Sequence, residues 1–353
     1  MPTARTKQTV KIMNEMPTPE VKKYRDLTVS EVADILSVKK NTLILCHTRP
    51  DCDTLGSAFA LREILRESGS RAWCVCANEI PERLRFVMQG QESVLRESIP
   101  ADFDAERIIS VDVASPAQLG ELEGEYADKV DIMIDHHATG TRYADGLVRP
   151  RAAAAGEIIF DIAEELRRRG ALTRTSRVPY TCIYAAISSD TGCFRYSSVT
   201  EDTHRIAAEL VKMGVDTAEV NHLLYDSKPL IQLRAEKLGF DRLSMYEDGK
   251  IAIITFPYAL KEQYGIKDEF LETLIDVART VEGVEVAAAI RQPSNENVFR
   301  CSLRSNEDAD VSSVAAKFGG GGHVKAAGCT VKADSIGDAE ALVLEAIKAE
   351  ITQ

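Results

Sequence analysis

The sequence contains no uninterrupted apolar run of 18 residues, so it offers no candidate transmembrane helix. The first twenty residues also lack the apolar segment of a secretory signal, and we expect a cytoplasmic protein. Eight cysteines are spread over 353 residues without a Cys-x-x-Cys pair, which excludes a disulfide-rich scaffold and favours reduced thiols.

Basic and aromatic residues are also scarce. The chain has 43 Lys and Arg against 55 Asp and Glu, a net charge of -12, and only 6% aromatic residues. Such a chain is not expected to coat long duplex nucleic acid or an anionic membrane surface. A small anionic substrate remains compatible with this charge, provided that local cations or metal ions attract it.

The chain is long enough for two or three domains, since one domain takes about 100–200 residues. Residues 1–25 carry six Lys or Arg and little apolar periodicity, which predicts a flexible basic tail. We place a first domain at residues 26–215, a linker at 216–240 and a smaller second domain at 241–353. No internal repeat is visible.

In the first domain, short apolar segments alternate with helical ones. Strand-like segments lie at residues 42–46, 72–76, 107–113 and 131–134, with helix-like segments at 30–37 and 55–68. This alternation favours a parallel sheet that is covered on both faces. Helical spacing follows at 157–170, 178–190, 200–214 and 230–238, and strands return at 251–256, 284–292 and 298–305. The predicted fold is therefore α/β: a parallel-sheet domain joined by a linker helix to a smaller α/β domain, in which a Gly-rich run at 319–322 precedes a last strand and a C-terminal helix.

Histidine and aspartate cluster beyond the carboxyl ends of the predicted strands. The residues are His47, Asp51 and Asp53 after the first strand, Asp112 at the end of the third, Asp135, His136 and His137 after the fourth, and Asp190 at the end of a helix. Because parallel strands carry their ligand sites beyond their carboxyl ends, four segments could deliver these side chains to one crevice.

Aspartates with imidazoles, and no cysteine among them, suit Mn²⁺ or a similar divalent ion. Asp51 and Asp53 could point their carboxylates at two neighbouring ions, which Asp112 could bridge. Two ions about 3.5–4 Å apart activate a water and stabilise the charge that develops in an in-line phosphoryl displacement. The start of the following helix adds a positive dipole end for phosphate.

Taken singly, each piece also has an ordinary structural explanation. Asp51 and Asp53 could be helix caps, His47 a loop residue, Asp112 a turn residue, His136 and His137 a surface turn, and the glycines 319–322 a flexible loop. Their joint occurrence, in this order, favours a functional site.

Together these segments resemble the motifs of DHH family phosphoesterases. The likeness is carried by HTRPDCDTLGS at 47–57, VD at 111–112, DHH at 135–137 and DTGCF at 190–194. The run GGGGHVKAAG at 319–328, with Arg304 and Ser305 before it, resembles the signature of the DHH-associated C-terminal domain. The likeness extends over about residues 40–345. One departure is Cys52, where the family usually has glycine.

Within that family the chain looks most like stand-alone oligoribonucleases of the nanoRNase type. The resemblance implies an Mn²⁺-dependent phosphoesterase that degrades short oligoribonucleotides and linear dinucleotides to mononucleotides, and in some members dephosphorylates 3'-phosphoadenosine 5'-phosphate. An alternative is a cyclic dinucleotide phosphodiesterase, although the membrane and sensory segments of the large cyclic-di-AMP hydrolases are missing. A non-catalytic nucleotide- or RNA-binding protein is a third hypothesis, disfavoured because all six expected metal ligands are present. A homodimer is possible.

The resemblance also implies a role for each site residue. His47, Asp51 and Asp112 would hold one Mn²⁺, and Asp53, Asp112, His136 and Asp190 a second. His137 and Asp112 would be the catalytic residues, with Asp135 orienting the histidines. Substrate would be gripped by Arg304, Ser305, Gly320, Gly321, Gly322 and His323.

Overall fold

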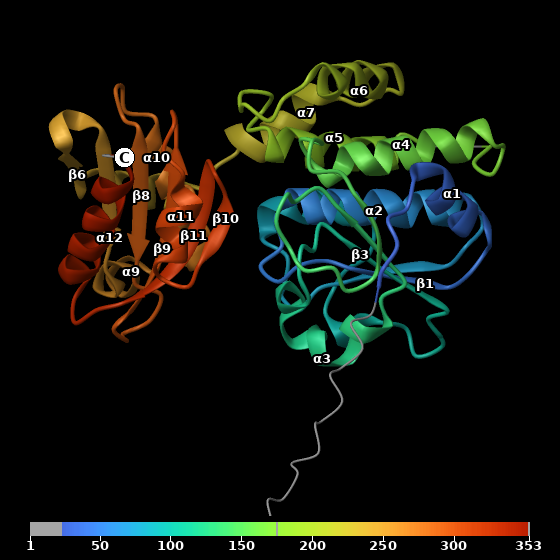
Figure 1. The fold of residues 1–353 in the computed structure, drawn as a ribbon, viewed down its shortest axis with the longest axis horizontal. Coiled ribbons are helices and arrows are strands. Elements are labelled where there is room, and N and C mark those ends of the chain that lie inside the picture. The colour runs from blue at the N-terminus through green and yellow to red at the C-terminus, as the bar shows by residue number, and fades with distance from the viewer. Residues whose placement is uncertain (1–22, 174–175, 352–353) are drawn as a thin grey trace, which may run out of the picture.

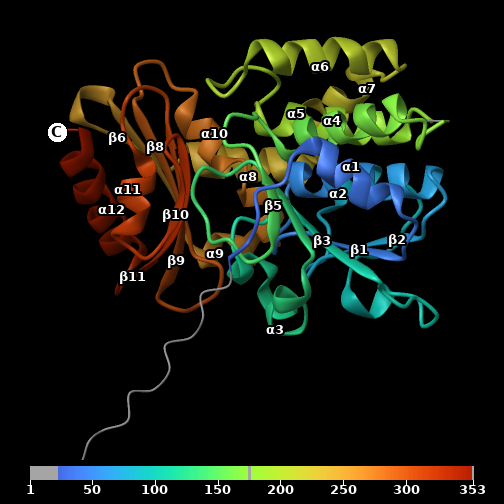
Figure 2. The same ribbon diagram turned by 45° about the vertical axis from the view of Figure 1, so that its right-hand side comes forward.

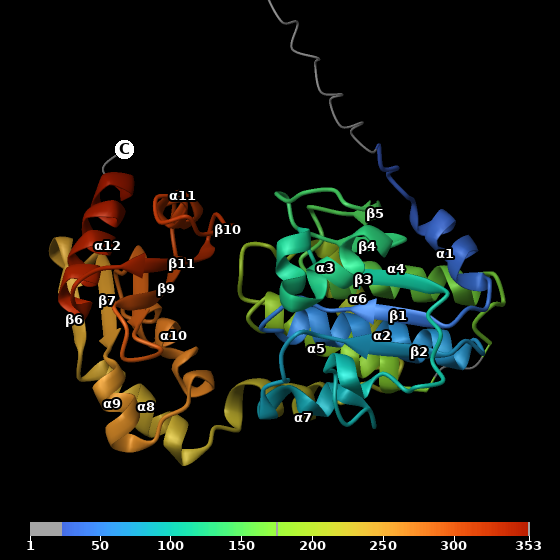
Figure 3. The ribbon, with the colours of Figure 1, turned by 90° about the horizontal axis from the view of Figure 1, so that it is seen from below.

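The computed structural model describes residues 23–173 and 176–351. The predicted basic tail therefore lies outside the described residues up to residue 22. The described chain forms two lobes, which a helical segment joins at one end (Figures 1 and 3). No helix within the described ranges is long and apolar enough to cross a membrane.

The N-terminal lobe is built on a five-stranded sheet in the order β2-β1-β3-β4-β5, and all its pairings are parallel. Its strands are β1 Thr42–Leu45, β2 Ala72–Val75, β3 Arg107–Val111, β4 Ile132–Asp135 and β5 Asp145–Val148. The predicted parallel sheet is confirmed. The short edge strand β5 was not predicted, because its sequence DGLV carries neither an apolar run nor alternation.

Helices cover both faces of this sheet. They are α1 Val29–Ser37, α2 Cys52–Glu67, α3 Glu123–Tyr126, α4 Ala155–Arg168, α5 Val178–Asp190, α6 Glu201–Lys212 and α7 Thr217–Asn221. Ile44 and Ile109 pack on the side of α1, α2, α4 and α5, whereas Leu43 and Ile108 pack on the side of α3. Each fully buried side chain of this kind contributes about 1.5–3 kcal/mol. Helix α6 forms a further layer over α4 and α5 (Figures 1 and 2).

Close packing of α2 and of α4 on α5 depends on glycine. A Cβ atom at Gly56 would lie 2.6 Å from the carbonyl oxygen of Cys182, and one at Gly156 would lie 2.9 Å from the Cβ of Ala186. The first turns of α2 and α4 therefore pack directly on the middle of α5, which ends at Asp190. Glycine at these positions brings the acidic end of α5 beside the acidic start of α2.

The segment that we predicted as a linker consists of two packed pieces. In the first piece, Asn221 of α7 accepts a hydrogen bond from Ser188 of α5, so α7 belongs with the N-terminal lobe. The second piece, α8 Leu230–Phe240, packs on the C-terminal lobe, where Gln232 donates to Thr273. The short stretch 227–229 lies between the two pieces.

The C-terminal lobe contains a mixed six-stranded sheet in the order β10-β11-β9-β8-β7-β6. Its strands are β6 Leu243–Tyr246, β7 Ile251–Phe256, β8 Val286–Arg291, β9 Val298–Ser305, β10 Gly321–His323 and β11 Ala326–Lys332. Its helices besides α8 are α9 Tyr258–Tyr264, α10 Leu274–Arg279, α11 Val311–Ala316 and α12 Ile336–Ile351. Part of the Gly-rich run thus forms strand β10 itself. This strand and β11 face the N-terminal lobe (Figures 1 and 3).

Candidate active site and metal centre

The carboxyl ends of β1 and β3 place His47 and Asp112 side by side. The Nε2 atom of His47 lies 3.6 Å from Oδ2 of Asp112 and 3.5 Å from Oδ1 of Asp51, the residue before α2. The chain turns from β1 toward β2 on one side and toward β3 on the other, so this edge is the switch point of the sheet, where such folds bind ligands.

A second group of side chains lies on the other side of Asp112. The Nε2 atom of His136 lies 3.5 Å from Oδ1 of Asp112, 3.6 Å from Oδ2 of Asp53 and 3.3 Å from Oδ2 of Asp190. The two oxygens of Asp112 therefore face different groups. Residues His47, Asp51 and Asp112 form one set that could hold a metal ion, and Asp53, Asp112 and His136 form another.

Asp112 is itself unusual in two respects. It is only 2% exposed, and its Oδ1 has no hydrogen-bond partner among the described residues. Its backbone has φ 59°, in the left-handed region that non-glycine residues rarely adopt and that costs about 1–3 kcal/mol. A buried carboxylate oxygen without a donor, held in place by a strained backbone, fits a metal ligand.

Backbone carbonyls orient the two histidines. The Nδ1 atom of His47 lies 2.9 Å from the oxygen of Thr48, and that of His136 lies 3.1 Å from the oxygen of Ala152. When Nδ1 carries the proton and donates it to these carbonyls, each Nε2 presents a lone pair to the carboxylates. Such a hydrogen bond is typical of histidines that bind metals.

The aspartates at the start of α2 also act as helix caps. Asp51 accepts hydrogen bonds from the backbone N–H groups of Asp53 and Thr54, at the start of α2. Asp53 is fully buried and accepts from the N–H groups of Ala155 and Gly156, at 2.7 and 3.1 Å, at the start of α4. Asp51 and Asp53 can therefore be helix caps and metal ligands at once, because capping fixes their carboxylates in place.

The carboxylates crowd one another. Burial, followed by the charge of Asp112, raises the pKa of Asp53 to about 7. Burial and the charges of Asp53 and Asp51 likewise raise the pKa of Asp190. Asp53 and Asp190 therefore cannot both be charged here at low cost without cations, and a hard divalent ion is the partner that oxygen and imidazole donors fit.

His137 differs from His136, although the two are adjacent. Its Nδ1 lies 2.8 Å from Oδ1 of Asp135, which also accepts from the backbone N–H of His136 at 2.8 Å. Burial alone would lower the pKa of His137, but this hydrogen bond and the negative charges of Asp112 and Asp135 raise it to about 9. Asp135 thus contacts the ring of His137 and the backbone of His136, and it favours a protonated His137.

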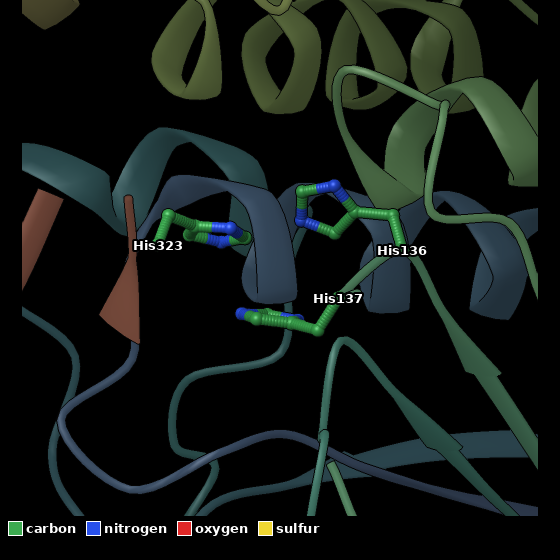
Figure 4. A group of neighbouring side chains, drawn as sticks. All are labelled: His136, His137 and His323. Carbon is green, nitrogen blue, oxygen red and sulfur yellow. The ribbon is translucent and has the colours of Figure 1, made fainter. Parts of the chain in front are cut away.

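The C-terminal lobe contributes His323 to this site. Its ring stacks on that of His137 with centroids 4.8 Å apart and lies 5.8 Å from that of His136 (Figure 4). Partial desolvation, followed by the neighbouring His137 and His136, lowers the pKa of His323 to about 4, although the residue is exposed. A residue nearly 190 positions away in the sequence therefore closes the site.

The other predicted substrate-binding residues do not all lie together. Arg304 is half-buried, and its Nη1 donates to the carbonyl of Leu303. Ser305, the next residue on β9, points to the opposite face, is 4% exposed and donates to the carbonyl of Glu307. The structure therefore does not bring these two side chains together. Glycines 321 and 322 lie in β10, next to His323.

Two residues at the site were not singled out in the sequence. The guanidinium of Arg279 lies over the ring of Tyr196, 4.8 Å from its centroid, and joins α10 to the loop after α5. Tyr196 follows the DTGCF motif by two positions, but nothing in the local pattern links it to a residue on the other lobe.

The fold and site together define a class of protein: a two-lobed α/β protein with a carboxylate–imidazole cluster that a second lobe closes. Residues 41–187 match the N-terminal domain of the DHH family, and residues 249–351 match the DHHA1 domain. The chain belongs to the DHH family of phosphoesterases, which are hydrolases, and it carries the DHHA1 domain. The resemblance seen in the sequence is thereby confirmed.

Several relatives align over nearly the whole chain. The bifunctional oligoribonuclease and PAP phosphatase NrnA of Thermus thermophilus is 29% identical over 91% of this chain and 94% of its own length. That of Bacillus subtilis is 26% identical over 86% and 93%. The cyclic-di-AMP phosphodiesterase GdpP of Geobacillus thermodenitrificans is 26% identical over 89% of this chain but only 48% of its own length. An exopolyphosphatase-related protein of Bacteroides fragilis shares the fold, with a TM-score of 0.82 at 21% identity over 91% of this chain and 95% of its own.

Proposed function

We propose that the protein is an Mn²⁺-dependent phosphoesterase that degrades short oligoribonucleotides and linear dinucleotides to mononucleotides, and that also dephosphorylates 3'-phosphoadenosine 5'-phosphate. The observation that carries this proposal is the position of Asp112, whose two carboxylate oxygens face His47 on one side and His136 on the other at 3.6 and 3.5 Å. NrnA relatives that match nearly end to end support the substrate class.

The cluster fits two divalent ions. His47, Asp51 and Asp112 would hold one, and Asp53, Asp112, His136 and Asp190 the other. Bound there, the ions would lower the pKa of an attacking water and stabilise negative charge on the scissile phosphate. The ligands are fixed before substrate arrives, because capping and the carbonyls of Thr48 and Ala152 hold them.

His137 is the proton-handling residue in this proposal. Asp135 occupies its Nδ1, so its Nε2 is the atom left for substrate. A protonated His137 can donate a hydrogen bond to a phosphate oxygen, or a proton to the departing ribose oxygen. His323, stacked on it, closes this side of the site.

The C-terminal lobe would hold the part of the substrate beyond the scissile bond. Arg304, Ser305, His323 and the backbone of 320–322 are the proposed grip, although Ser305 faces away from Arg304 in this arrangement. A guanidinium can bind phosphate through two parallel hydrogen bonds. A site enclosed between two lobes admits short substrates and disfavours long ones.

Cyclic dinucleotide hydrolysis is the second candidate. It is favoured by the match to the cyclic-di-AMP phosphodiesterase GdpP, which covers 89% of this chain but about half of that protein. Both candidates use the same metal centre, so only the substrate distinguishes them.

A substrate panel tests the proposal. We expect the Mn²⁺-loaded protein to hydrolyse the dinucleotide pApA and 3'-phosphoadenosine 5'-phosphate faster than cyclic di-AMP or pyrophosphate. A chelator should abolish this turnover, and added Mn²⁺ should restore it. A clear preference for cyclic di-AMP would support the second candidate, whereas nucleotide binding without any turnover would support a non-catalytic protein.

A further inference from the structure

The contact between Tyr196 and Arg279 joins the two lobes beside the site. Tyr196 lies six residues after Asp190, and its ring covers Gly192, where a Cβ atom would lie 2.2 Å from the ring carbon Cζ. Arg279 lies on the ring, 4.8 Å from its centroid. Gly192, with φ 54°, therefore leaves the room in which the Tyr196 ring sits, and the ring carries a guanidinium from the other lobe.

Arg279 is also anchored to the strand that carries Arg304. Its Nη2 donates to Oδ1 of Asn306 at 3.3 Å, and Nδ2 of Asn306 donates back to the carbonyl of Arg279 at 2.9 Å. Asn306 follows directly after β9, two residues beyond Arg304. The end of α10 and the end of β9 therefore form one unit, and the two arginines belong to it.

Neither guanidinium is neutralised. Within residues 23–173 and 176–351, neither Arg279 nor Arg304 has a carboxylate at ion-pair distance, and the charges of Asp276 and Asp190 act on Arg304 only from farther away. Burial, with the nearby charge of Arg279, lowers the pKa of Arg304. Two partly buried guanidinium groups, joined through Asn306 and without a carboxylate partner, indicate a place where an anion binds.

We propose that Arg279, held on the ring of Tyr196, is a second ligand for the terminal phosphate of the substrate, so that the enzyme selects substrates that carry a phosphate at their far end. Tyr196 is a positioning residue in this arrangement. The substrate class is then 5'-phosphorylated dinucleotides and nucleoside 3',5'-bisphosphates, whose second phosphate Arg279 and Arg304 bind together. This inference rests on the proposed function and narrows it.

Equilibrium binding tests this inference without turnover. Calorimetry on the Mn²⁺-loaded protein would measure dissociation constants for non-hydrolysable methylenephosphonate analogues of pApA and of ApA, which lacks the terminal phosphate. We expect the parent protein to bind the phosphorylated analogue at least about tenfold tighter, since each tenfold corresponds to about 1.4 kcal/mol, within the range of one charge-assisted contact. In Arg279→Gln this preference should largely disappear.

Variants at Tyr196 distinguish a role in positioning Arg279 from a general effect on the fold. Tyr196→Phe keeps the ring and should keep the preference, whereas Tyr196→Leu should lose it as Arg279→Gln does. Arg279→Lys, which keeps the charge without the planar fork, should retain part of it. The matched control is Arg83→Gln, which removes another contact between the lobes, the ion pair with Glu272 at 3.5 Å, and should leave the preference unchanged.

The outcomes are distinct. If Arg279→Gln retains the preference, or weakens binding of both analogues by the same factor, the inference is wrong and Arg279 serves only to join the lobes. If the parent protein shows the preference but hydrolyses none of the nucleotides in the substrate panel, the proposed function fails while the phosphate site stands.

Discussion

The imidazole of His323 stacks on that of His137 with an interplanar angle of 22°, although the two rings belong to different lobes. This contact places the C-terminal lobe directly against the candidate metal centre. The residues that would hold metal and the residues that would hold substrate therefore meet at one interface.

Asp112→Ala should abolish turnover while the fold remains intact. Without a carboxylate between them, two cations at short range repel each other, so at least one should leave. Bound Mn²⁺ by elemental analysis and kcat/KM on pApA are the measurements. The control is Asp102→Ala, which removes an exposed carboxylate that pairs with Arg71 far from the site. Activity of Asp112→Ala within about tenfold of the parent, about 1.4 kcal/mol, would contradict a shared ligand.

Arg304→Ala should impair nucleotide substrates while two Mn²⁺ ions stay bound. Losing a bidentate phosphate contact weakens binding and raises KM, and a misplaced scissile bond can also lower kcat. A minimal chromogenic phosphodiester has no far phosphate, so its hydrolysis should suffer less than that of pApA. Equal losses on both substrates, or a loss of metal, would refute the division of roles between the lobes.

Short substrates should be preferred over long ones. We expect the highest rates at about two to five nucleotides, because extended RNA needs a continuous basic groove with aromatic platforms, which this acidic, aromatic-poor chain does not suggest. Initial rates on pApA and on an RNA of about 24 nucleotides, at matched subsaturating concentrations, provide the comparison. Equal rates on the two substrates would contradict this prediction and would show that the site also admits long RNA.

Gly56→Ala should destabilise the N-terminal lobe and weaken metal binding together. The added methyl group would lie 2.6 Å from the backbone oxygen of Cys182, so α2 and α5 must separate, at a cost of about 1–3 kcal/mol. Thermal unfolding and Mn²⁺ titration measure the two effects. The control is Gly124→Ala in α3, where nothing lies within 4 Å of the added atom. An unchanged Mn²⁺ affinity in a destabilised Gly56→Ala would separate this packing from the metal centre.

Much of this protein could be predicted from local sequence. Buried strands such as Thr42–Leu45 and Ile251–Phe256 are continuous apolar runs, and that pattern depends on neighbours in the chain alone. Parallel topology follows from the alternation with helices, and it predicts that His47 and Asp112 lie at one edge. The sequence therefore determined the fold class and which segments carry the chemistry.

Only the tertiary structure decided how those segments act together. Strand β5, whose sequence DGLV shows neither an apolar run nor alternation, exists because it pairs with β4. The opposite directions of Arg304 and Ser305 depend on the register of β9. The stack of His323 on His137 and the position of Arg279 on Tyr196 join residues that are 186 and 83 positions apart, from lobes that fold around separate cores. Such contacts leave no trace in local composition or periodicity, because the packing of one lobe on the other sets them.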